Sequence, residues 1–182
     1  MVQNDGRETN ETVFWRAVKA RMGLEKDRLE PEFTRFYEEG FEIARGATQA
    51  RAEIRELVQD LQARGCTLVA ATNPVFPAIA TRNRLRWAGF DPDSFRLITT
   101  YEHMHHAKPS TGYYAEILDL LGVRPEECLM AGNDNQEDMC AEALGIDGYL
   151  ITDCLINRDD APITCTWQGT FAEFARKVGE LL

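Results

Sequence analysis

From residue 49 onward, helical patterns alternate with apolar runs that are short enough to be buried strands. The apolar residues of 54–61 recur at the spacing of one helix face, and the apolar run 66–71 follows directly. The same order repeats, which predicts helices over 77–87, 113–121 and 137–144 and strands over 95–99, 128–131 and 149–152. Strands separated by such helices form a parallel sheet with helices on both faces. We therefore expect an α/β fold.

The first 48 residues carry helical patterns only. Asn10 is placed to cap a first helix, and Gly23 is placed to end it. A second helix is predicted to begin after Pro31, with an aromatic stripe typical of a core face, and to stop at Gly46. At the other end of the chain, the pattern over 170–182 predicts one more amphipathic helix.

The negative charge of the chain is concentrated in one block. Residues 116–160 hold twelve acidic and two basic residues, whereas the rest of the chain has 18 of each. Such a block repels a phosphate backbone, so we expect no nucleic-acid binding. It suits a divalent cation, although a solvated acidic face accounts equally well for most of these residues.

The sequence also indicates the cellular compartment and the state of the cysteines. Its apolar runs are far shorter than the roughly 20 residues that a membrane helix needs, and residues 1–5 lack the features of a secretory signal. We expect a cytoplasmic protein that does not contact a membrane. The five cysteines are widely spaced and form no C-x-x-C pair, which argues against disulfides and against a zinc site.

Polar residues follow three of the predicted strands, where ligands bind in parallel sheets. Thr72 and Asn73 follow the first, and Lys108 precedes Pro109 after the second. The third ends in a glycine and continues into Asp134 and Asp138, whose oxygens suit Mg²⁺. Each has another explanation: the Thr72 hydroxyl can cap the next helix, and Asp138 can complement a helix dipole. The dipole does not explain Asp134 as readily.

Together these three motifs, in this order, resemble the second, third and fourth signatures of the haloacid dehalogenase (HAD) superfamily, over about residues 49–157. The resemblance implies a Rossmann-like core over 49–182 and a helical cap portion over 1–48. It also implies Mg²⁺-dependent hydrolysis of a small phosphorylated metabolite through an aspartyl-phosphate. By position, Thr72 and Asn73 would bind the phosphoryl group, Lys108 would balance charge, and Asp134 and Asp138 would hold Mg²⁺.

The first signature of that family, a buried strand ending in D-x-D, has no counterpart in this sequence. The only D-x-D, at 91–93, reads as a turn, and Asn4-Asp5-Gly6 has no apolar run before it. We expect that Met1 is internal to a longer protein. Two alternatives stay open, namely a non-catalytic phosphate- or metal-binding relative and a split enzyme that receives its nucleophile strand from another chain.

All three histidines lie in the segment 102–106, too close together to build a tetrahedral metal site. We expect them to line a substrate loop or to be solvated. Within the same superfamily, a 2-haloacid dehalogenase is a further alternative, although it needs no metal and so leaves the two aspartates unexplained. The sequence does not specify the substrate or the oligomeric state.

Overall fold

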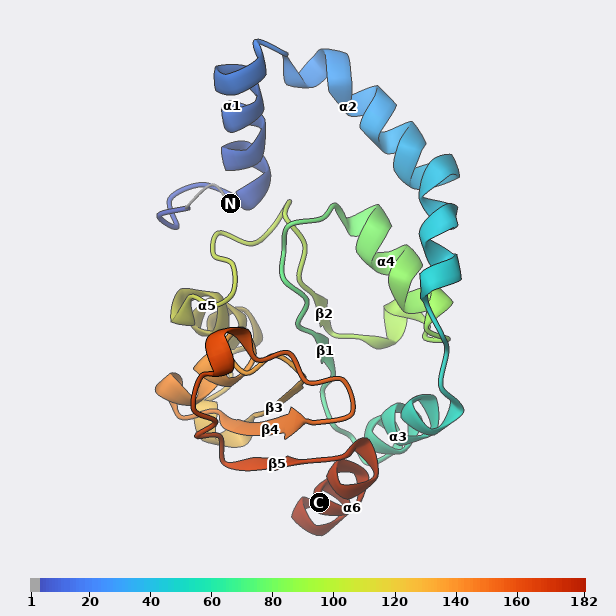
Figure 1. Ribbon diagram of the computed structural model, residues 1–182, viewed down its shortest axis with the longest axis vertical. Helices are drawn as coiled ribbons and strands as arrows, with labels where there is room; N and C mark the ends of the chain where they lie inside the picture. The colour runs from blue at the N-terminus through green and yellow to red at the C-terminus, as the bar shows by residue number, and fades with distance from the viewer. Residues whose placement is uncertain (1–3) are drawn as a thin grey trace. The chain divides into compact units, whose positions relative to one another are not determined.

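The computed structural model describes residues 4–182, and the chain forms two compact units, Met1–His105 and His106–Leu182 (Figure 1). Every strand pair is parallel, which confirms the predicted class of fold. Residues 1–3 of the segment tested for a secretory signal lie outside the described residues. The predicted division into a cap portion and a core at residues 48 and 49 stays a prediction.

The first unit begins with a helical segment. Its elements are α1 (Asn10–Met22), α2 (Lys26–Arg35), the π-helical turn η1 (Phe36–Gly40) and the 3₁₀ segment η2 (Phe41–Ala47). Gly23 ends α1 in the left-handed conformation, as predicted. The predicted cap was wrong by one residue, because the Thr9 side chain accepts the amide of Thr12.

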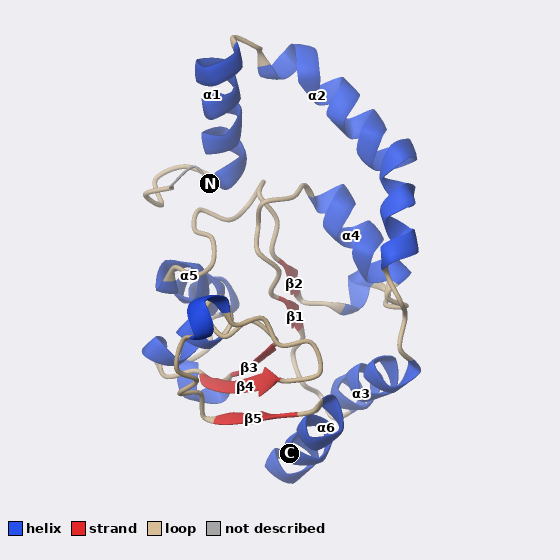
Figure 2. Ribbon diagram, viewed as in Figure 1, coloured by secondary structure: helices blue, strands red, loops and turns tan. Residues whose placement is uncertain are grey.

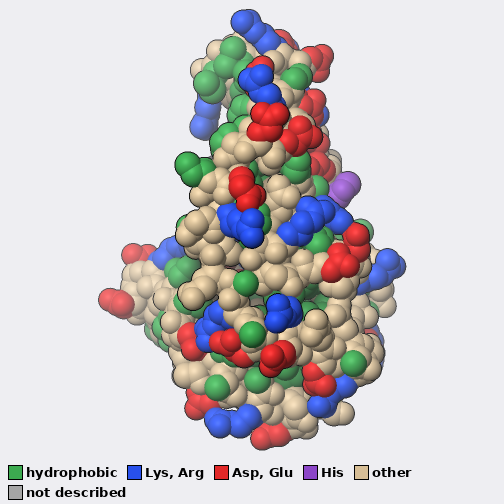
Figure 3. Space-filling view, turned by 90° about the vertical axis from the view of Figure 1, so that its right-hand side faces the viewer, with side chains coloured by type: hydrophobic (Ala, Val, Ile, Leu, Met, Phe, Trp, Pro, Cys, Tyr) green, Lys and Arg blue, Asp and Glu red, His purple; other side chains and the backbone are tan. Residues whose placement is uncertain are grey.

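The second helix was predicted to begin after Pro31, but it begins at Lys26, five residues before that proline, which therefore lies inside it. Lys26 in its first turn donates to Glu11 of α1 at 2.8 Å, which holds the helix start in place upstream of the proline. Figure 3 shows acidic and basic side chains interspersed over the side of the molecule that carries α2, and pairs such as Arg45–Glu42 are spaced three residues apart. This face is therefore a solvated one.

The rest of the first unit holds a two-stranded parallel sheet. Its elements are α3 (Ala52–Ala63), β1 (Val69–Ala70), α4 (Ala78–Trp87), the 3₁₀ turn η3 (Pro92–Ser94) and β2 (Leu97–Ile98). Val69 pairs with Leu97 and Ala70 with Ile98. Both strands are shorter than predicted, because only these residues complete the ladder although the apolar runs extend further.

The second unit is built around a three-stranded parallel sheet in the order β3-β4-β5 (Figure 2). Its elements are α5 (Thr111–Leu121), η4 (Pro125–Glu127), β3 (Leu129–Gly132), η5 (Met139–Leu144), β4 (Asp147–Ile151), η6 (Arg158–Asp160), β5 (Trp167–Gly169) and α6 (Phe171–Leu181). The central strand β4 buries three consecutive residues, as expected of a strand flanked on both sides. β5 was not predicted.

The predicted helix over 137–144 is instead a 3₁₀ segment that starts at Met139. The carboxylate of Asp134 accepts the amides of Gln136 and Glu137, so the preceding residues are held in a turn. Within η5, the Glu142 carboxylate accepts the amide of Gly148 in β4 at 3.1 Å. It also accepts both the amide and the hydroxyl of Thr166, which directly precedes β5.

The core of the second unit lies between its sheet and its helices. Leu150 of β4 is fully buried, and the ring of Tyr149 lies 5.0 Å from that of Phe174 in α6. Thr170 caps α6 through a reciprocal pair of bonds with Glu173. Among residues 4–182, no helix combines the length and the apolar character needed to cross a membrane.

Candidate active site

The loop that follows β3 holds two buried carboxylates in a fixed arrangement. Asp134 and Asp138 are 6% and 7% exposed. The Asp134 amide donates to Asp138 Oδ2 at 2.9 Å, and the Asp138 amide donates to the Asp134 carbonyl at the same distance. Gly132 completes the arrangement, because a Cβ atom there would lie 2.1 Å from Asp138 Oδ2. Only glycine therefore lets the strand end approach the carboxylate this closely.

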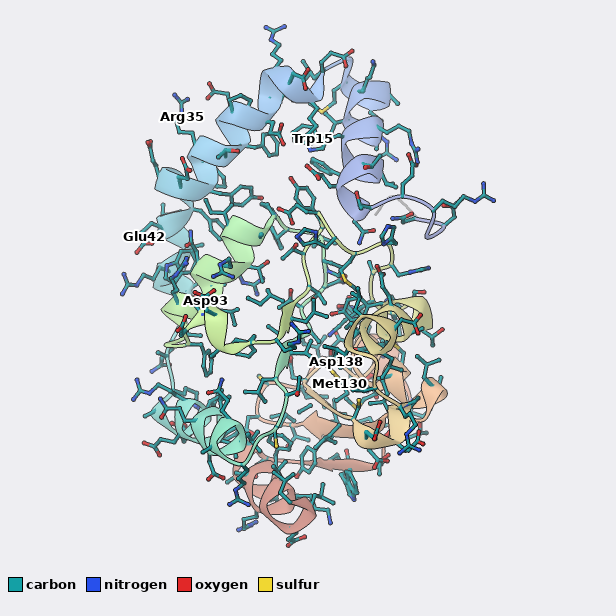
Figure 4. The ribbon with its side chains drawn as sticks, turned by 180° about the vertical axis from the view of Figure 1, so that it is seen from behind. Trp15, Arg35, Glu42, Asp93, Met130 and Asp138 are labelled. Atoms are coloured by element: carbon teal, nitrogen blue, oxygen red, sulfur yellow. The ribbon has the colours of Figure 1, made fainter. Side chains whose placement is uncertain are left out.

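Lys108 extends into this carboxylate pair from the segment before α5. Its Nζ donates to Asp138 Oδ1 at 2.6 Å, and the lysine is only 5% exposed (Figure 4 labels Asp138). The ammonium also lies 5.6 Å from the ring centres of both Tyr113 and Tyr114. A buried charge needs such partners, and these contacts leave the lysine little freedom to move.

Arg158 is a member of this site that the sequence did not single out. Its Nη1 lies 2.8 Å from Asp134 Oδ2 and 3.0 Å from Oδ1, and its Nη2 lies 3.4 Å from Glu137 Oε1. The sequence could have indicated Arg158, because it is one of only two basic residues among the twelve acidic residues of 116–160. Unlike Lys108, Arg158 is half-exposed, so burial does not hold its guanidinium in place.

Two neighbouring groups are kept in their neutral forms. Burial, followed by the negative charge of Asp138, raises the pKa of Tyr114 well above its usual range, so its hydroxyl stays protonated and donates to the Glu137 carbonyl at 2.9 Å. Burial also raises the pKa of the Cys140 thiol to about 11, although the nearby Lys108 charge opposes this shift. Neither group is therefore activated as a nucleophile at neutral pH.

Thr72 and Asn73 lie in the first unit and follow β1 after one intervening residue. The Thr72 hydroxyl donates to the Thr99 carbonyl at 3.2 Å, and the Thr99 hydroxyl donates back to the Thr72 carbonyl at 2.7 Å. Thr99 is fully buried and was not identified from the sequence. These reciprocal bonds fix the backbone that follows β1 to the end of β2.

Five residues were predicted to form one site, and the structure brings three of them together. Lys108, Asp134 and Asp138 are in contact in the second unit, while Thr72 and Asn73 belong to the first. Of the histidines, His106 Nδ1 lies 3.4 Å from Glu116 Oε2, which is a weak contact. The Asp91–Asp93 segment is a turn, as predicted, since the Asp91 side chain accepts the Asp93 amide at 3.0 Å.

The donor set at Asp134 and Asp138 fits a hard divalent cation in its chemistry, because both side chains are buried carboxylates and backbone hydrogen bonds hold the two residues together. Mg²⁺ binds proteins through one or two such carboxylates and keeps several waters. Within residues 4–182, however, no group of three or more His, Cys, Asp or Glu side chains is arranged to hold a metal ion. In this structure a base accompanies each of the two aspartates.

The family model that describes haloacid dehalogenase-like hydrolases matches residues 6–141. Two similar solved structures come from phosphatases. For a HAD phosphatase from Thermococcus onnurineus, the TM-score is 0.63 at 19% identity, and the match covers 93% of this chain and 90% of that one. For a predicted phosphoglycolate phosphatase from Haemophilus somnus 129PT, the TM-score is also 0.63 at 19% identity, and the match covers 93% of this chain and 75% of that one.

An L-2-haloacid dehalogenase from Xanthobacter autotrophicus is similar as well. Its TM-score is 0.57 at 13% identity, with 72% of this chain and 61% of that chain covered. No curated protein matches the sequence significantly. At these identities the structural likeness establishes the fold, which is a Rossmann-like parallel sheet with a helical cap.

Proposed function

Because the chain belongs to the haloacid dehalogenase-like hydrolases, we propose that it acts as a Mg²⁺-dependent phosphatase on a small phosphorylated metabolite. The observation that carries the proposal is the buried Lys108, held at 2.6 Å by Asp138 beside the second buried carboxylate of Asp134. This arrangement supplies positive charge for a phosphate and hard oxygen ligands for a cation. Phosphoryl transfer depends mainly on such positioning and charge neutralisation.

In the proposed reaction an aspartate oxygen attacks phosphorus, and the bond from phosphorus to the ester oxygen breaks. The leaving oxygen takes a proton from a neighbouring carboxylic acid. Water then attacks the aspartyl-phosphate, which releases inorganic phosphate and restores the carboxylate. Lys108 would offset the negative charge on the phosphate throughout. That Thr72 and Asn73 bind phosphate oxygens stays a prediction.

Asp134 and Asp138 are the residues that would hold Mg²⁺, and the ion would supply charge neutralisation at the phosphate. For this, Asp134 would exchange the guanidinium of Arg158 for the ion. Arg158 is 52% exposed and Asp134 only 8%, so the arginine is the partner that moves. Replacing Arg158 with glutamine should therefore tighten Mg²⁺ binding, whereas Asp134→Asn should weaken it; calorimetric titration with MgCl₂ measures both.

The nucleophile in this proposal comes from a further strand that carries a D-x-D sequence. Among the described residues, β3 pairs with β4 alone, and along β3 Ala131 is exposed and its neighbours are only half-buried. An apolar strand edge left in this state is a place where another strand can pair. We propose that the nucleophile strand adds to this edge, directly beside the strand that leads to Asp134.

The test is hydrolysis of a panel of phosphomonoesters by the protein with its upstream coding sequence included, with Mg²⁺ and with EDTA. We expect release of inorganic phosphate that EDTA abolishes and that Lys108→Ala reduces by about 10²-fold or more. Lys177→Ala, on α6, is the control: this lysine is 32% exposed and pairs with Glu180, and its loss should leave the rate unchanged. Absence of turnover with every phosphomonoester would reject the phosphatase.

A binding module is the second candidate, and one observation favours it. Both site aspartates already have a base beside them, so within the described residues their negative charges are balanced without a metal ion. This candidate predicts saturable phosphate binding without turnover, even when the upstream sequence is present. Metal-independent release of chloride from 2-chloropropionate would instead identify a dehalogenase.

A further inference from the structure

The first unit contains a cavity of about 210 Å³ that none of the residues discussed above as phosphatase machinery lines. Its walls come from α1, α2, the start of η1 and the segments around Pro77 and Tyr101. Typical pockets for drug-sized ligands occupy about 300–1,000 Å³, so this cavity has room for a small group of a few heavy atoms.

Aromatic rings form much of this wall: Trp15, Phe33, Tyr37 and Tyr101. Trp15 is 5% exposed, and its ring centre lies 5.4 Å from that of Phe33 at an angle of 63°. Figure 4 shows Trp15 on the side of α1 that faces α2. Phe14 buttresses the group, since its ring lies 6.4 Å from Phe33 and 6.2 Å from Tyr101. Trp15, Phe33 and Tyr101 are thus linked by ring contacts, directly or through Phe14, while Phe33 keeps 39% of its surface exposed.

Three carboxylates, but no lysine, arginine or histidine, complete the lining. Glu102 Oε1 accepts the amide of Ala78 at 2.8 Å, while its buried Oε2 has no hydrogen-bond partner among the described residues. The other two, Glu11 and Glu30, share the single ammonium of Lys26, at 2.8 and 3.3 Å. The carboxylates thus outnumber the neighbouring base by three to one.

The pKa of Tyr101, one of the two tyrosines in the wall, reflects this excess of negative charge. Burial raises the pKa of Tyr101 to about 12, and the charges of Glu11 and Glu102 both add to the shift. Lys26 acts in the opposite direction but does not cancel them. A positive group in the cavity would therefore gain from both carboxylates, and a negative group would be repelled.

We propose that this cavity binds a small organic ammonium group, which the aromatic rings enclose and Glu102 neutralises. Ring faces attract cations more strongly when water is excluded, and quaternary ammonium groups are held in such aromatic cages. The unpartnered oxygen of Glu102 supplies the negative charge that balances the positive charge of the ammonium group. This inference does not rest on the proposed phosphatase activity, because it concerns binding within the first unit alone.

Calorimetric titration of the 182-residue protein with tetramethylammonium chloride tests the proposal. This cation has no hydrogen-bond donor, so its binding reports the rings and the carboxylates. We expect saturable binding, and no binding of tert-butanol, which has a similar size and no charge. Sodium chloride at the same concentration controls for ionic strength. The proposal is overturned if tetramethylammonium gives no saturable heat or if tert-butanol binds equally well.

Variants assign the binding to this cavity. Glu102→Gln keeps the acceptor for the Ala78 amide, so the fold should be retained, and we expect affinity to fall about tenfold. Glu38→Gln, at an exposed position of η1 outside the lining, is the matched control and should stay within twofold. Equal affinity of these two variants would refute the assignment.

A third variant gives a result of the opposite sign. Lys26→Met removes the ammonium that occupies Glu11 and Glu30, so it should tighten tetramethylammonium binding several-fold. A general loss of folding would weaken binding in every variant and cannot produce this increase. If Lys26→Met weakens binding while its circular dichroism spectrum matches that of the parent protein, the electrostatic part of the proposal is wrong.

Discussion

Replacing Asp138 with asparagine tests whether the buried pair with Lys108 organises the site. The carboxylate now serves two donors, since Oδ1 accepts Lys108 Nζ at 2.6 Å and Oδ2 accepts the Asp134 amide at 2.9 Å. Asparagine offers one acceptor oxygen and an NH₂ group. One of the two donors must therefore face another donor, and the 5%-exposed lysine loses its counter-charge.

Removing one partner of a buried ion pair costs about 3–5 kcal/mol, because the other charge is left uncompensated. With a urea dependence of about 1–3 kcal/mol per molar, the unfolding midpoint should fall by roughly 1–5 M. Urea titrations followed by circular dichroism measure this shift. Glu180→Gln breaks the exposed Lys177–Glu180 pair of α6 and should change the free energy of unfolding by less than about 0.5 kcal/mol.

The double variant Lys108→Met/Asp138→Asn separates charge from packing. Once the lysine is gone, the asparagine oxygen can accept the Asp134 amide and no buried charge lacks a partner. We expect the double variant to regain about half or more of the loss caused by Asp138→Asn. If Asp138→Asn costs no more than Glu180→Gln, or the double variant is less stable than Asp138→Asn alone, then charge compensation does not hold this site together.

Three further predictions concern the same unit. Gly132→Ala places a Cβ against the carboxylate behind it and should cost about 1–3 kcal/mol in urea unfolding, whereas Gly179→Ala, with open space around it, should be neutral or stabilising; equal effects would disprove the close approach. Cys140, with its pKa raised to about 11 by burial, should react with iodoacetamide about tenfold faster per pH unit from pH 8 to 10 in peptide mass mapping, and a plateau near pH 9 would contradict the shift. Thr170→Ala removes the side-chain cap of α6 and should lower the free energy of unfolding in urea by about 1 kcal/mol; an unchanged value would mean that Glu173 alone holds the helix start.

Periodicity predicted the elements whose apolar faces are long enough to repeat. The helices over 52–63, 78–87 and 171–181 lie within two residues of their predictions, because apolar residues recur along each of them at the spacing of one helix face. The strand β5 was missed because its three residues, Trp167–Gly169, form no apolar run, so no local pattern marks them. The 3₁₀ segment η5 was taken for an α-helix, since side-chain bonds from Asp134 change the start.

The sequence predicted the site residues that come after a strand and missed those that reach the site from a distant part of the chain. Asp134 follows β3 directly, and Lys108 lies in the segment before α5, from which it reaches Asp138 within the same unit. Arg158 reaches Asp134 from η6, 24 residues further along the chain, and no spacing rule connects the two. Thr99 was missed for a different reason, because its contribution is a pair of hydrogen bonds to backbone atoms.

The hydrogen bonds to the Glu142 carboxylate couple the local unfolding of three segments of the second unit. It receives hydrogen bonds from Gly148 and from Thr166, so one side chain joins η5, the start of β4 and the approach to β5. None of these segments can detach without breaking bonds that the other two share. We expect the amide hydrogens of Gly148 and Thr166 to exchange with solvent through one common opening, and Glu142→Gln to accelerate both together.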